Sequence, residues 1–163
     1  MTARLFSLVL VVNLLSVCAN ASQEKFPFVA TITSDHINVR AGQSANFERL
    51  CQLNKNDEAV VVARSFGWSK IKLPSTAKSY VSAKYVQVVN GLGTVTADRV
   101  NIRAEANFNS TILGQVRQGD KVQVIERVKD WYKIIPIEES YGWVADKYIK
   151  FKSYDLATYH NSL

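Results

Sequence analysis

The chain contains one internal repeat without a gap. A shift of 63 residues lays residues 31–86 over residues 94–149 with no insertion. The coinciding residues include Asn38/Asn101, Arg40/Arg103, Trp68/Trp131, Lys84/Lys147 and Tyr85/Tyr148. A period this long predicts one small domain built twice. Because a unit of about 60 residues buries little core, we expect contact between the two units to add stability.

The first 21 residues lie outside the repeat and have a different composition. Arg4 is the only charged residue before Glu24, and residues 5–15 form an apolar run broken only by two polar residues. Ala-Asn-Ala at 19–21 has the pattern of a signal-peptidase cleavage site. We therefore predict a secretory signal over residues 1–21, with cleavage before Ser22 and export to the periplasm or cell envelope. The run is shorter than the ~20 apolar residues that a bilayer span needs, so no membrane span remains after cleavage.

Two cysteines leave alternatives open. Leu-Ser-Val-Cys at 15–18 resembles a bacterial lipobox, in which the cysteine receives a lipid, although Val17 departs from the small residue usual there. After cleavage Cys51 is alone and forms no intrachain disulfide. It is either a small buried residue or a nucleophile. A nucleophile needs a nearby base, and the only histidines are His36 and His160.

Short strands with turn signals dominate each unit. Residues 37–40 and 100–103 alternate apolar and polar side chains, and residues 59–63 and 122–125 are rich in β-branched residues. Turns are expected at Phe66-Gly67 and Lys129-Asp130, and the chain after residue 21 has no convincing amphipathic helix. The pattern predicts an all-β protein in which each unit is a small barrel or sandwich.

The repeat and its glycines suggest domain boundaries. Gly91 and Gly93 stand close together and mark a break between the units. We divide the chain into the signal, a first domain, a linker, a second domain and a C-terminal tail, at residues 1–21, 22–89, 90–93, 94–150 and 151–163. The tail has no partner in the repeat and either packs back or frays.

Three motifs in these units resemble one known family. Asp35-x-x-Asn-Val-Arg-Ala-Gly-x-Ser44 looks like the opening signature of bacterial SH3-like (SH3b) domains. Gly114-x-x-x-x-Gly-Asp-x-Val-x-Val124, followed by Trp131-Tyr-Lys-Ile134 and Gly142-Trp-Val144, is similar to the rest of the family pattern. The resemblance covers residues 29–89 and 93–150. It implies two tandem small SH3-like β-barrels and an extracytoplasmic binding module, because some members bind peptidoglycan peptides.

The chain departs from the family pattern in its loops. Gln43 stands where the family has a proline, and Glu-Ala-Asn at 105–107 replaces Gly-Pro-Ser. Ser-Tyr-Val at 79–81 replaces the closing Gly-Trp-Val. These changes leave the expected fold intact but alter the loops and aromatic residues that shape a binding groove.

Aromatic side chains are the candidate ligand-binding residues, because they offer a large apolar face with a polar tip. They are Trp131, Tyr132, Tyr141, Trp143, Trp68 and Tyr80. The two tryptophans shared by the repeats either cover a core end or form a groove wall. We expect the groove in the second repeat, where Tyr132, Tyr141 and Trp143 are additional aromatic residues.

Charged residues that recur in both copies are predicted to serve the fold. Arg40 and Arg103 are expected to bridge to Asp57 and Asp120, respectively, within each barrel. Asp35, like its repeat partner Asp98, is expected to cap a turn.

Catalysis has little support in the sequence. There is no Cys/His spacing for a metal, no glycine-rich phosphate loop, no serine-triad motif and no acid pair typical of a glycosidase. The net charge is +6, but no Lys/Arg block is dense enough to indicate nucleic acid binding. We therefore predict a binding module that is not an enzyme and needs no cofactor, with cell-wall peptide or glycan as the ligand. The alternative is an envelope adaptor that binds another protein, for example through an exposed strand edge.

Overall fold

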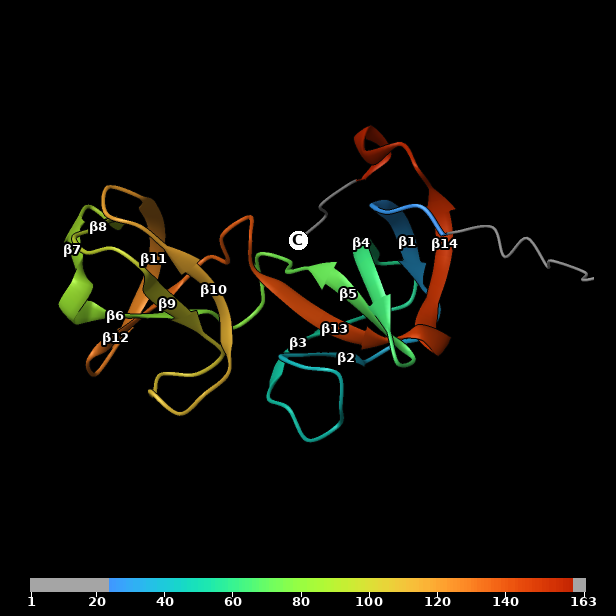
Figure 1. Cartoon of the computed structure of the whole chain (residues 1–163), viewed down its shortest axis with the longest axis horizontal. Helices are drawn as coiled ribbons and strands as arrows, with labels where there is room; N and C mark the ends of the chain where they lie inside the picture. The colour runs from blue at the N-terminus through green and yellow to red at the C-terminus, as the bar shows by residue number, and fades with distance from the viewer. Residues whose placement is uncertain (1–23, 160–163) are drawn as a thin grey trace, which may run out of the picture.

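The computed structural model describes residues 24–159, which form two lobes of strands lying side by side (Figure 1). The predicted signal, with Cys18 and the cleavage site, lies outside the described residues. Every regular element that the model describes is a strand or a 3₁₀ turn, which confirms the all-β prediction.

The two repeats form the same elements in the same order. In the first repeat these are β1 (Phe28–Ile32), β2 (Ile37–Arg40), β3 (Arg49–Leu53), β4 (Glu58–Ser65), β5 (Trp68–Lys72), β6 (Tyr80–Ser82), η1 (Ala83–Tyr85) and β7 (Val86–Val89). In the second they are β8 (Leu92–Val95), β9 (Val100–Arg103), β10 (Ile112–Val116), β11 (Lys121–Val128), β12 (Trp131–Ile134), β13 (Tyr141–Ala145), η2 (Asp146–Tyr148) and β14 (Ile149–Ser153). The turns expected before Trp68 and Trp131 are present, with positive φ at Phe66 and Lys129.

The sheets do not follow the repeats. One seven-stranded sheet, lobe 1, has the order β14-β1-β4-β5-β13-β2-β3. The other, lobe 2, has the order β10-β9-β6-β12-β11-β8-β7. The repeats therefore exchange their last strands: β6 and β7 join lobe 2, while β13 and β14 join lobe 1. In Figure 1 the orange β13 lies among the strands of the first repeat.

This exchange changes the meaning of the predicted boundaries. Residues 90–93, expected to be a linker, contain the tight turn of the β7–β8 hairpin. Val89 pairs with Leu92, and Asn90 and Gly91 between them have φ of 50° and 80°. Asn-Gly is the sequence most favoured in such two-residue turns. Because β7 must then pair with β8, the divisions 22–89 and 94–150 describe the sequence repeats, whereas lobe 2 is the continuous stretch 80–134. Lobe 1 takes strands from both ends of the chain.

An approximate two-fold relation connects the lobes. The chain crosses between them twice, through residues 73–79 and 135–140, and the Leu73 N–H donates to the Ser140 carbonyl at 3.1 Å. Glu48 accepts hydrogen bonds from the backbone N–H and the hydroxyl of Thr111, at 2.9 and 2.8 Å. Residues 48 and 111 occupy the same position in the two repeats. A contact between equivalent positions is typical of a two-fold interface.

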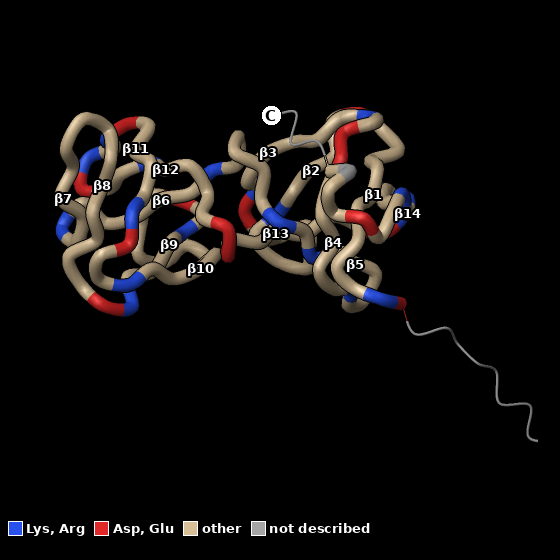
Figure 2. Tube along the Cα trace, turned by 90° about the horizontal axis from the view of Figure 1, so that it is seen from above, with Lys and Arg blue, Asp and Glu red and all other residues tan. Residues whose placement is uncertain are grey.

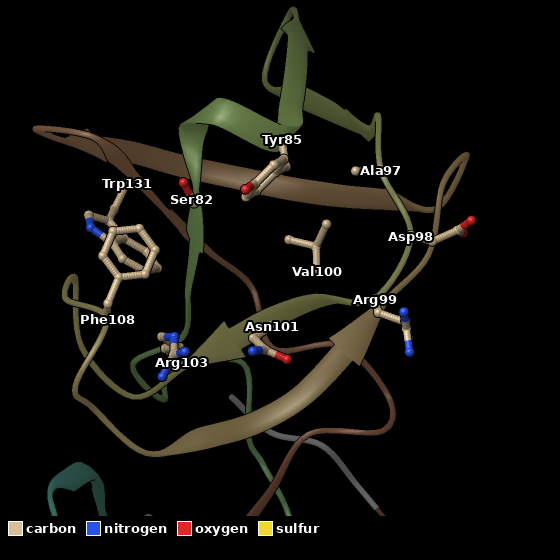
Figure 3. A pocket seen from close by; sticks show the side chains of 10 residues that line it. All are labelled: Ser82, Tyr85, Ala97, Asp98, Arg99, Val100, Asn101, Arg103, Phe108 and Trp131. Atoms are coloured by element: carbon tan, nitrogen blue, oxygen red, sulfur yellow. The ribbon is translucent and has the colours of Figure 1, made fainter.

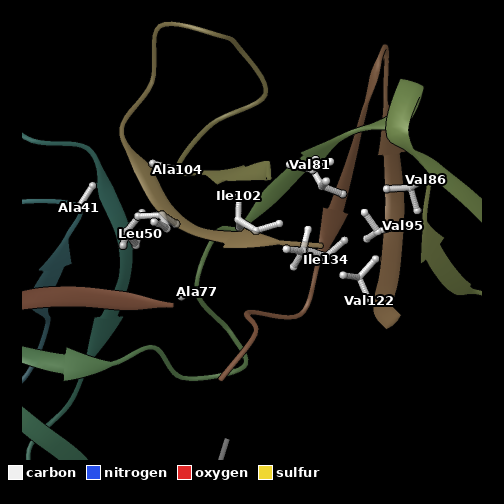
Figure 4. Close-up of a cluster of buried hydrophobic side chains, with 13 residues drawn as sticks. Ala41, Leu50, Ala77, Val81, Val86, Val95, Ile102, Ala104, Val122 and Ile134 are labelled. Carbon is white, nitrogen blue, oxygen red and sulfur yellow. The ribbon is translucent and has the colours of Figure 1, made fainter. Parts of the chain in front are cut away.

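Each lobe has an apolar cluster, and one cluster extends between the lobes. The cluster of lobe 1 includes Phe28, Ile32 and Ile71. The cluster of lobe 2 includes Ile102 and Ile134 and continues to Ala41, Leu50 and Ala77 of the first repeat (Figure 4). Two small units thus share buried surface, as the size of one repeat led us to expect.

The described part of the tail packs back on lobe 1. Its first residues belong to β14, which pairs with β1. The rings of Phe151 and Tyr154 lie 5.4 and 6.4 Å from the ring of Phe28. A short 3₁₀ turn, η3 (Leu156–Thr158), follows.

Candidate functional site: two equivalent grooves

Lobe 2 carries an open hollow of about 310 Å³ (Figure 3). Ser82 and Tyr85 line it from the first repeat, while Arg103, Phe108 and Trp131 come from the second. The strand exchange therefore builds one groove from both halves of the chain.

Strand alternation explains why these side chains meet. Trp131 pairs with Ser82, and Tyr80 on the same strand pairs with Arg103. Alternate residues of β6, β9 and β12 point to the same face of the sheet. Their neighbours Val81 and Ile102 point the other way, into the core. The groove is thus the outer face of three strands.

The aromatic wall of the groove is a pair of rings that lie next to each other in Figure 3. The ring centroids of Phe108 and Trp131 are 4.8 Å apart, with planes tilted by 58°. Trp131 is only 5% exposed, whereas Phe108 is 67% exposed. Phe108 therefore covers the tryptophan and presents its own outer face to solvent.

A braced loop holds Phe108 in place. The Arg103 guanidinium donates from Nη1 to the Ser110 carbonyl at 2.7 Å. The Ser110 hydroxyl bonds to the carbonyls of Glu105 and Asn107, at 3.1 and 3.2 Å. These bonds fix the loop that carries the exposed ring, so the wall is formed before any ligand arrives.

Polar groups surround the apolar wall. Asn101 and Arg103 line the groove on β9, and Arg99 and Asp98 lie at the turn before that strand. The Lys84 Nζ lies 5.3 Å from the centroid of the Tyr85 ring. An apolar face with nearby amide, guanidinium and hydroxyl groups suits a ligand that has both a ring or aliphatic face and oxygen acceptors.

Lobe 1 carries the equivalent groove, of about 360 Å³. Asn38, Arg40 and Trp68 occupy the positions of Asn101, Arg103 and Trp131, and Tyr148 from the second repeat replaces Tyr85. The difference is Ala45, which stands where lobe 2 has Phe108.

The aromatic residue of the lobe 1 loop takes another place. Phe47 lies against Gly42, where an added Cβ would come within 2.6 Å of the phenyl carbons. The ring is thus folded onto its own loop. Arg40 donates to the Phe47 carbonyl at 2.9 Å, as Arg103 does to Ser110. The same bracing arginine therefore supports two different loops.

The structure divides the predicted aromatic residues between the lobes. Trp131 and Tyr80 lie on the outer face of lobe 2, while Trp68, Tyr141 and Trp143 lie on lobe 1. Trp143 pairs with Lys70 on one side and Arg40 on the other, and the Lys70 Nζ lies 4.4 Å from the Tyr141 ring centroid. The expected cluster of Tyr132, Tyr141 and Trp143 does not form, because β13 crosses to lobe 1.

Tyr132 is placed apart from the groove wall. As the neighbour of Trp131 on β12, it points to the opposite side of the sheet and packs against the core of lobe 2. The Arg127 guanidinium lies 5.8 Å from its ring centroid. Tyr132 lines a second hollow that shares Phe108 with the groove.

The recurring charged residues serve turns and loops. The ion pairs expected from Arg40 to Asp57 and from Arg103 to Asp120 are not formed between these described side chains. Instead, Asp57 and Asp120 accept from the backbone N–H three residues earlier, each at 2.7 Å. Asp35 accepts from the Lys55 N–H at 3.0 Å, 20 residues along the chain, so it joins two distant turns rather than capping its own.

Sequence reasoning missed Phe108 and Tyr85 as groove residues. Phe108 aligns with an alanine in a loop, and Tyr85 is identical in both copies, so it does not stand out as a difference between the repeats. The signal for Phe108 was an apolar ring in an otherwise polar loop.

Cys51 lies in an environment that disfavours its thiolate form. The Cys51 side chain packs against both apolar clusters, and burial raises the pKa of its thiol to about 12. A nucleophilic cysteine needs the opposite shift. Among residues 24–159, no group of three His, Cys, Asp or Glu side chains is placed to hold a metal. Over the same residues, no helix is long and apolar enough to span a membrane.

Charges of both signs are spread over the two lobes (Figure 2). Lys and Arg alternate with Asp and Glu along the trace rather than forming one basic face.

A family model described as bacterial SH3 domain matches the chain twice, over residues 35–87 and 98–150. Among curated proteins, "Putative N-acetylmuramoyl-L-alanine amidase YrvJ" of Bacillus subtilis is 25% identical over 80% of this chain and 28% of its own length. The β-N-acetylglucosaminidase of the same organism is 39% identical over 40% of this chain and 7% of its own length. Bacteriocin BCN5 of Clostridium perfringens is 40% identical over 31% of this chain and 6% of its own length. The chain thus spans well under a third of each of these relatives.

Proposed function

Because the chain belongs to the bacterial SH3 domain family, we propose that it is a non-catalytic module that binds cell-wall peptide or glycan. The groove of lobe 2 is the proposed principal site. The names of the amidase and glucosaminidase relatives support amino-sugar polymers and their peptides as the ligand class.

The observation that carries this proposal is the exposed Phe108 ring braced over Trp131. Aromatic side chains give large contact area at a small cost in conformational entropy, and they are frequent among binding hot spots. A sugar ring or an alanine methyl group fits such a surface. Asn101, Ser82 and the remaining Arg103 nitrogens lie beside it to bind amide or carboxylate oxygens.

The groove of lobe 1 is proposed to bind the same ligand class more weakly. It retains the arginine, asparagine and tyrosine positions, together with Trp68. Tyr141 and Trp143 extend its aromatic surface along β13. Because residue 45 is alanine, no aromatic ring of that loop packs against Trp68. The aromatic wall of this groove is therefore smaller than the wall in lobe 2.

A pull-down on purified peptidoglycan tests the site with the full mature chain. Phe108→Ala should weaken binding about tenfold, at the modest end of hot-spot effects, because it removes the exposed wall. Phe47→Ala is the matched control, since it removes a partly exposed ring from the equivalent loop outside the groove. Equal binding by wild type and Phe108→Ala would refute the assignment of the groove.

The non-catalytic part of the proposal has a separate test. Labelled cell wall is incubated with the full mature chain, and soluble fragments are measured over time. We expect retention of the label on the insoluble wall. Release of peptide or sugar above the buffer control would instead assign a hydrolytic activity.

Export is the third part of the proposal and rests on the sequence of residues 1–21. Mass spectrometry of the protein recovered from the envelope should show Ser22 at the amino terminus. A lipid-modified Cys18 at that terminus would overturn this cleavage site and place the protein on a membrane surface.

A further inference from the structure

The outer face of lobe 1 is covered by the end of the chain. Val29 on β1 pairs with Val60 on β4. Both point away from the core residues Ala30 and Ala59, yet they are only 0% and 4% exposed. A second layer must therefore lie over this side of the sheet.

The tail segment 154–159 lies against β1 and is the candidate for that layer. Its 3₁₀ turn η3 contacts β1. Burial raises the pKa of the Tyr159 hydroxyl, the charge of Glu58 raises it further, and the charge of Lys72 lowers it. The Lys152 ammonium also pairs with Glu58, which ties β14 to the covered face.

The same face of lobe 2 is bare. The equivalents of Val29 and Val60 are Leu92 and Gln123, which also pair. Leu92 is 44% exposed and Ile125 is 50% exposed. Ile135 and Val89 are exposed as well. The four apolar residues Val89, Leu92, Ile125 and Ile135 are called the uncovered face from here on.

These residues form one patch rather than scattered exposures. Val89 pairs with Leu92, and Leu92 pairs with Gln123. The Ile135 N–H donates to the Gln123 carbonyl at 3.0 Å. Ile125 is two residues further along the strand of Gln123. Contiguous exposed apolar residues usually mark an interaction surface.

The turn chemistry explains why the chain covers only one lobe. In lobe 1, β14 is the last strand and the chain continues into the tail. In lobe 2, the equivalent strand β7 runs through Asn90-Gly91 directly into β8. The two-residue turn leaves no segment between β7 and β8 to fold back over the sheet, and no other part of residues 24–159 covers these side chains.

We propose that the uncovered face is a docking surface for a polypeptide segment of a partner protein with the chemistry of the tail. Lobe 1 shows the kind of segment that fits this face, a short turn with aromatic and aliphatic side chains. The charge at one position is reversed, because Lys121 replaces Glu58 under the repeat. Glu58 pairs with Lys152 of β14, and its equivalent Lys121 donates to the Thr94 hydroxyl at 2.6 Å, so the covering segment supplies no charge at this position in lobe 1 and needs none in lobe 2.

The test uses the full isotope-labelled chain and a synthetic peptide with the sequence of residues 152–159. NMR follows the chemical shifts of the backbone amides while the peptide concentration is raised to the millimolar range. We expect shifts centred on the four residues of the uncovered face. Ile125→Glu with Ile135→Glu should weaken peptide binding about tenfold or more, since two apolar anchors are lost.

Two controls separate this surface from the groove. Ile112→Glu changes an exposed isoleucine on β10, outside the uncovered face, and should leave the peptide shifts unchanged. The Ile125→Glu/Ile135→Glu variant should also bind peptidoglycan as wild type does. Wall binding and peptide docking can therefore fail independently.

Either of two results would overturn the inference. One is the absence of peptide-dependent shifts on the uncovered face. The other is concentration-dependent self-association of the chain in sedimentation experiments that the double variant abolishes, because a second copy would then be the occupant.

Discussion

Lobe 1 and lobe 2 contain equivalent strands in the same order, but their grooves and outer faces differ. Lobe 1 has a groove without a stacked ring and an outer face covered by the tail. Lobe 2 has a groove walled by Phe108 and Trp131 and an outer face without a cover. The outer face of lobe 1 is thus covered by its own chain, while lobe 2 carries both the proposed principal groove and the proposed docking surface.

The comparison shows how a duplicated unit can divide its roles. Residues that brace the loops and turns, such as Arg40 and Arg103, keep the same contacts in both lobes. The two lobes differ at the equivalent positions of Ala45 and Phe108, and on the outer face. The fold requires no particular side chain at either place. The exchange of strands ties the stability of each lobe to both repeats.

The largest expected effect separates the two shared tryptophans. Trp131→Ala should lower the free energy of unfolding by about 3–5 kcal/mol, because a buried ring is replaced by a cavity. Trp68→Ala should cost less, since Trp68 is half-buried and has no ring stacked on it. Urea unfolding of both variants measures the difference, and equal losses would break the comparison.

The next effect compares Gly142 with its repeat partner Ser79, which lie where the chain enters the other lobe. A Cβ on Gly142 would lie 2.6 Å from Val39 Cγ1 and 2.7 Å from Leu73 Cδ2, so Gly142→Ala should destabilise by about 1–3 kcal/mol through overpacking. Its repeat partner is Ser79, whose buried hydroxyl has no hydrogen-bond partner among the described residues. Ser79→Ala should therefore be neutral or stabilising in the same unfolding assay.

A smaller effect belongs to the contact between the lobes. Burial raises the pKa of Glu48, but the hydrogen bonds from Thr111 and from the backbone N–H of Glu48 itself together outweigh burial and hold the pKa below its ordinary value of 4.5. The stabilisation is therefore present above about pH 4.5 and is lost as pH falls through the lower pKa of the folded chain. Glu48→Gln should cost about 1 kcal/mol at neutral pH. The gap to wild type should narrow in acid, and a pH-independent gap would contradict this assignment.

The smallest effect tests whether one ring distinguishes the grooves. Ala45→Phe places an aromatic side chain beside Trp68, where an aromatic pair is worth about 0.5–1.5 kcal/mol. We expect the affinity for peptidoglycan to rise a few-fold. A pull-down measures it, with the Phe108→Ala protein as the reference. Unchanged binding would mean that the loops differ in more than the ring.

The strands and turns could be predicted from the sequence because the formation of each depends mainly on residues close together in the chain. Alternation at 37–40 and 100–103 and the turns at Phe66 and Lys129 follow from side-chain direction and backbone preference. The sequence predicts a break between domains at residues 90–93, yet Asn90-Gly91 forms the turn of a hairpin. Whether it separates two domains or joins two strands depends on partners far along the chain, which local patterns do not reveal.

The groove was predictable only in part for the same reason. Trp131, Trp68 and Tyr80 were identified as aromatic candidates and do lie on the groove strands. Their grouping was wrong because Tyr141 and Trp143 cross to lobe 1, while Tyr85 crosses to lobe 2. A site assembled by strand exchange has no signature within either repeat.

The most direct test of this account compares two fragments of similar size. Residues 78–137 contain all seven strands of lobe 2 and its whole groove, whereas residues 93–163 contain the second repeat and incomplete parts of both sheets. Circular dichroism during unfolding, with a peptidoglycan pull-down, reports folding and binding together. We predict that 78–137 unfolds cooperatively and binds, while 93–163 does neither. Cooperative folding and binding by 93–163, without either in 78–137, would contradict the strand exchange and the composite groove.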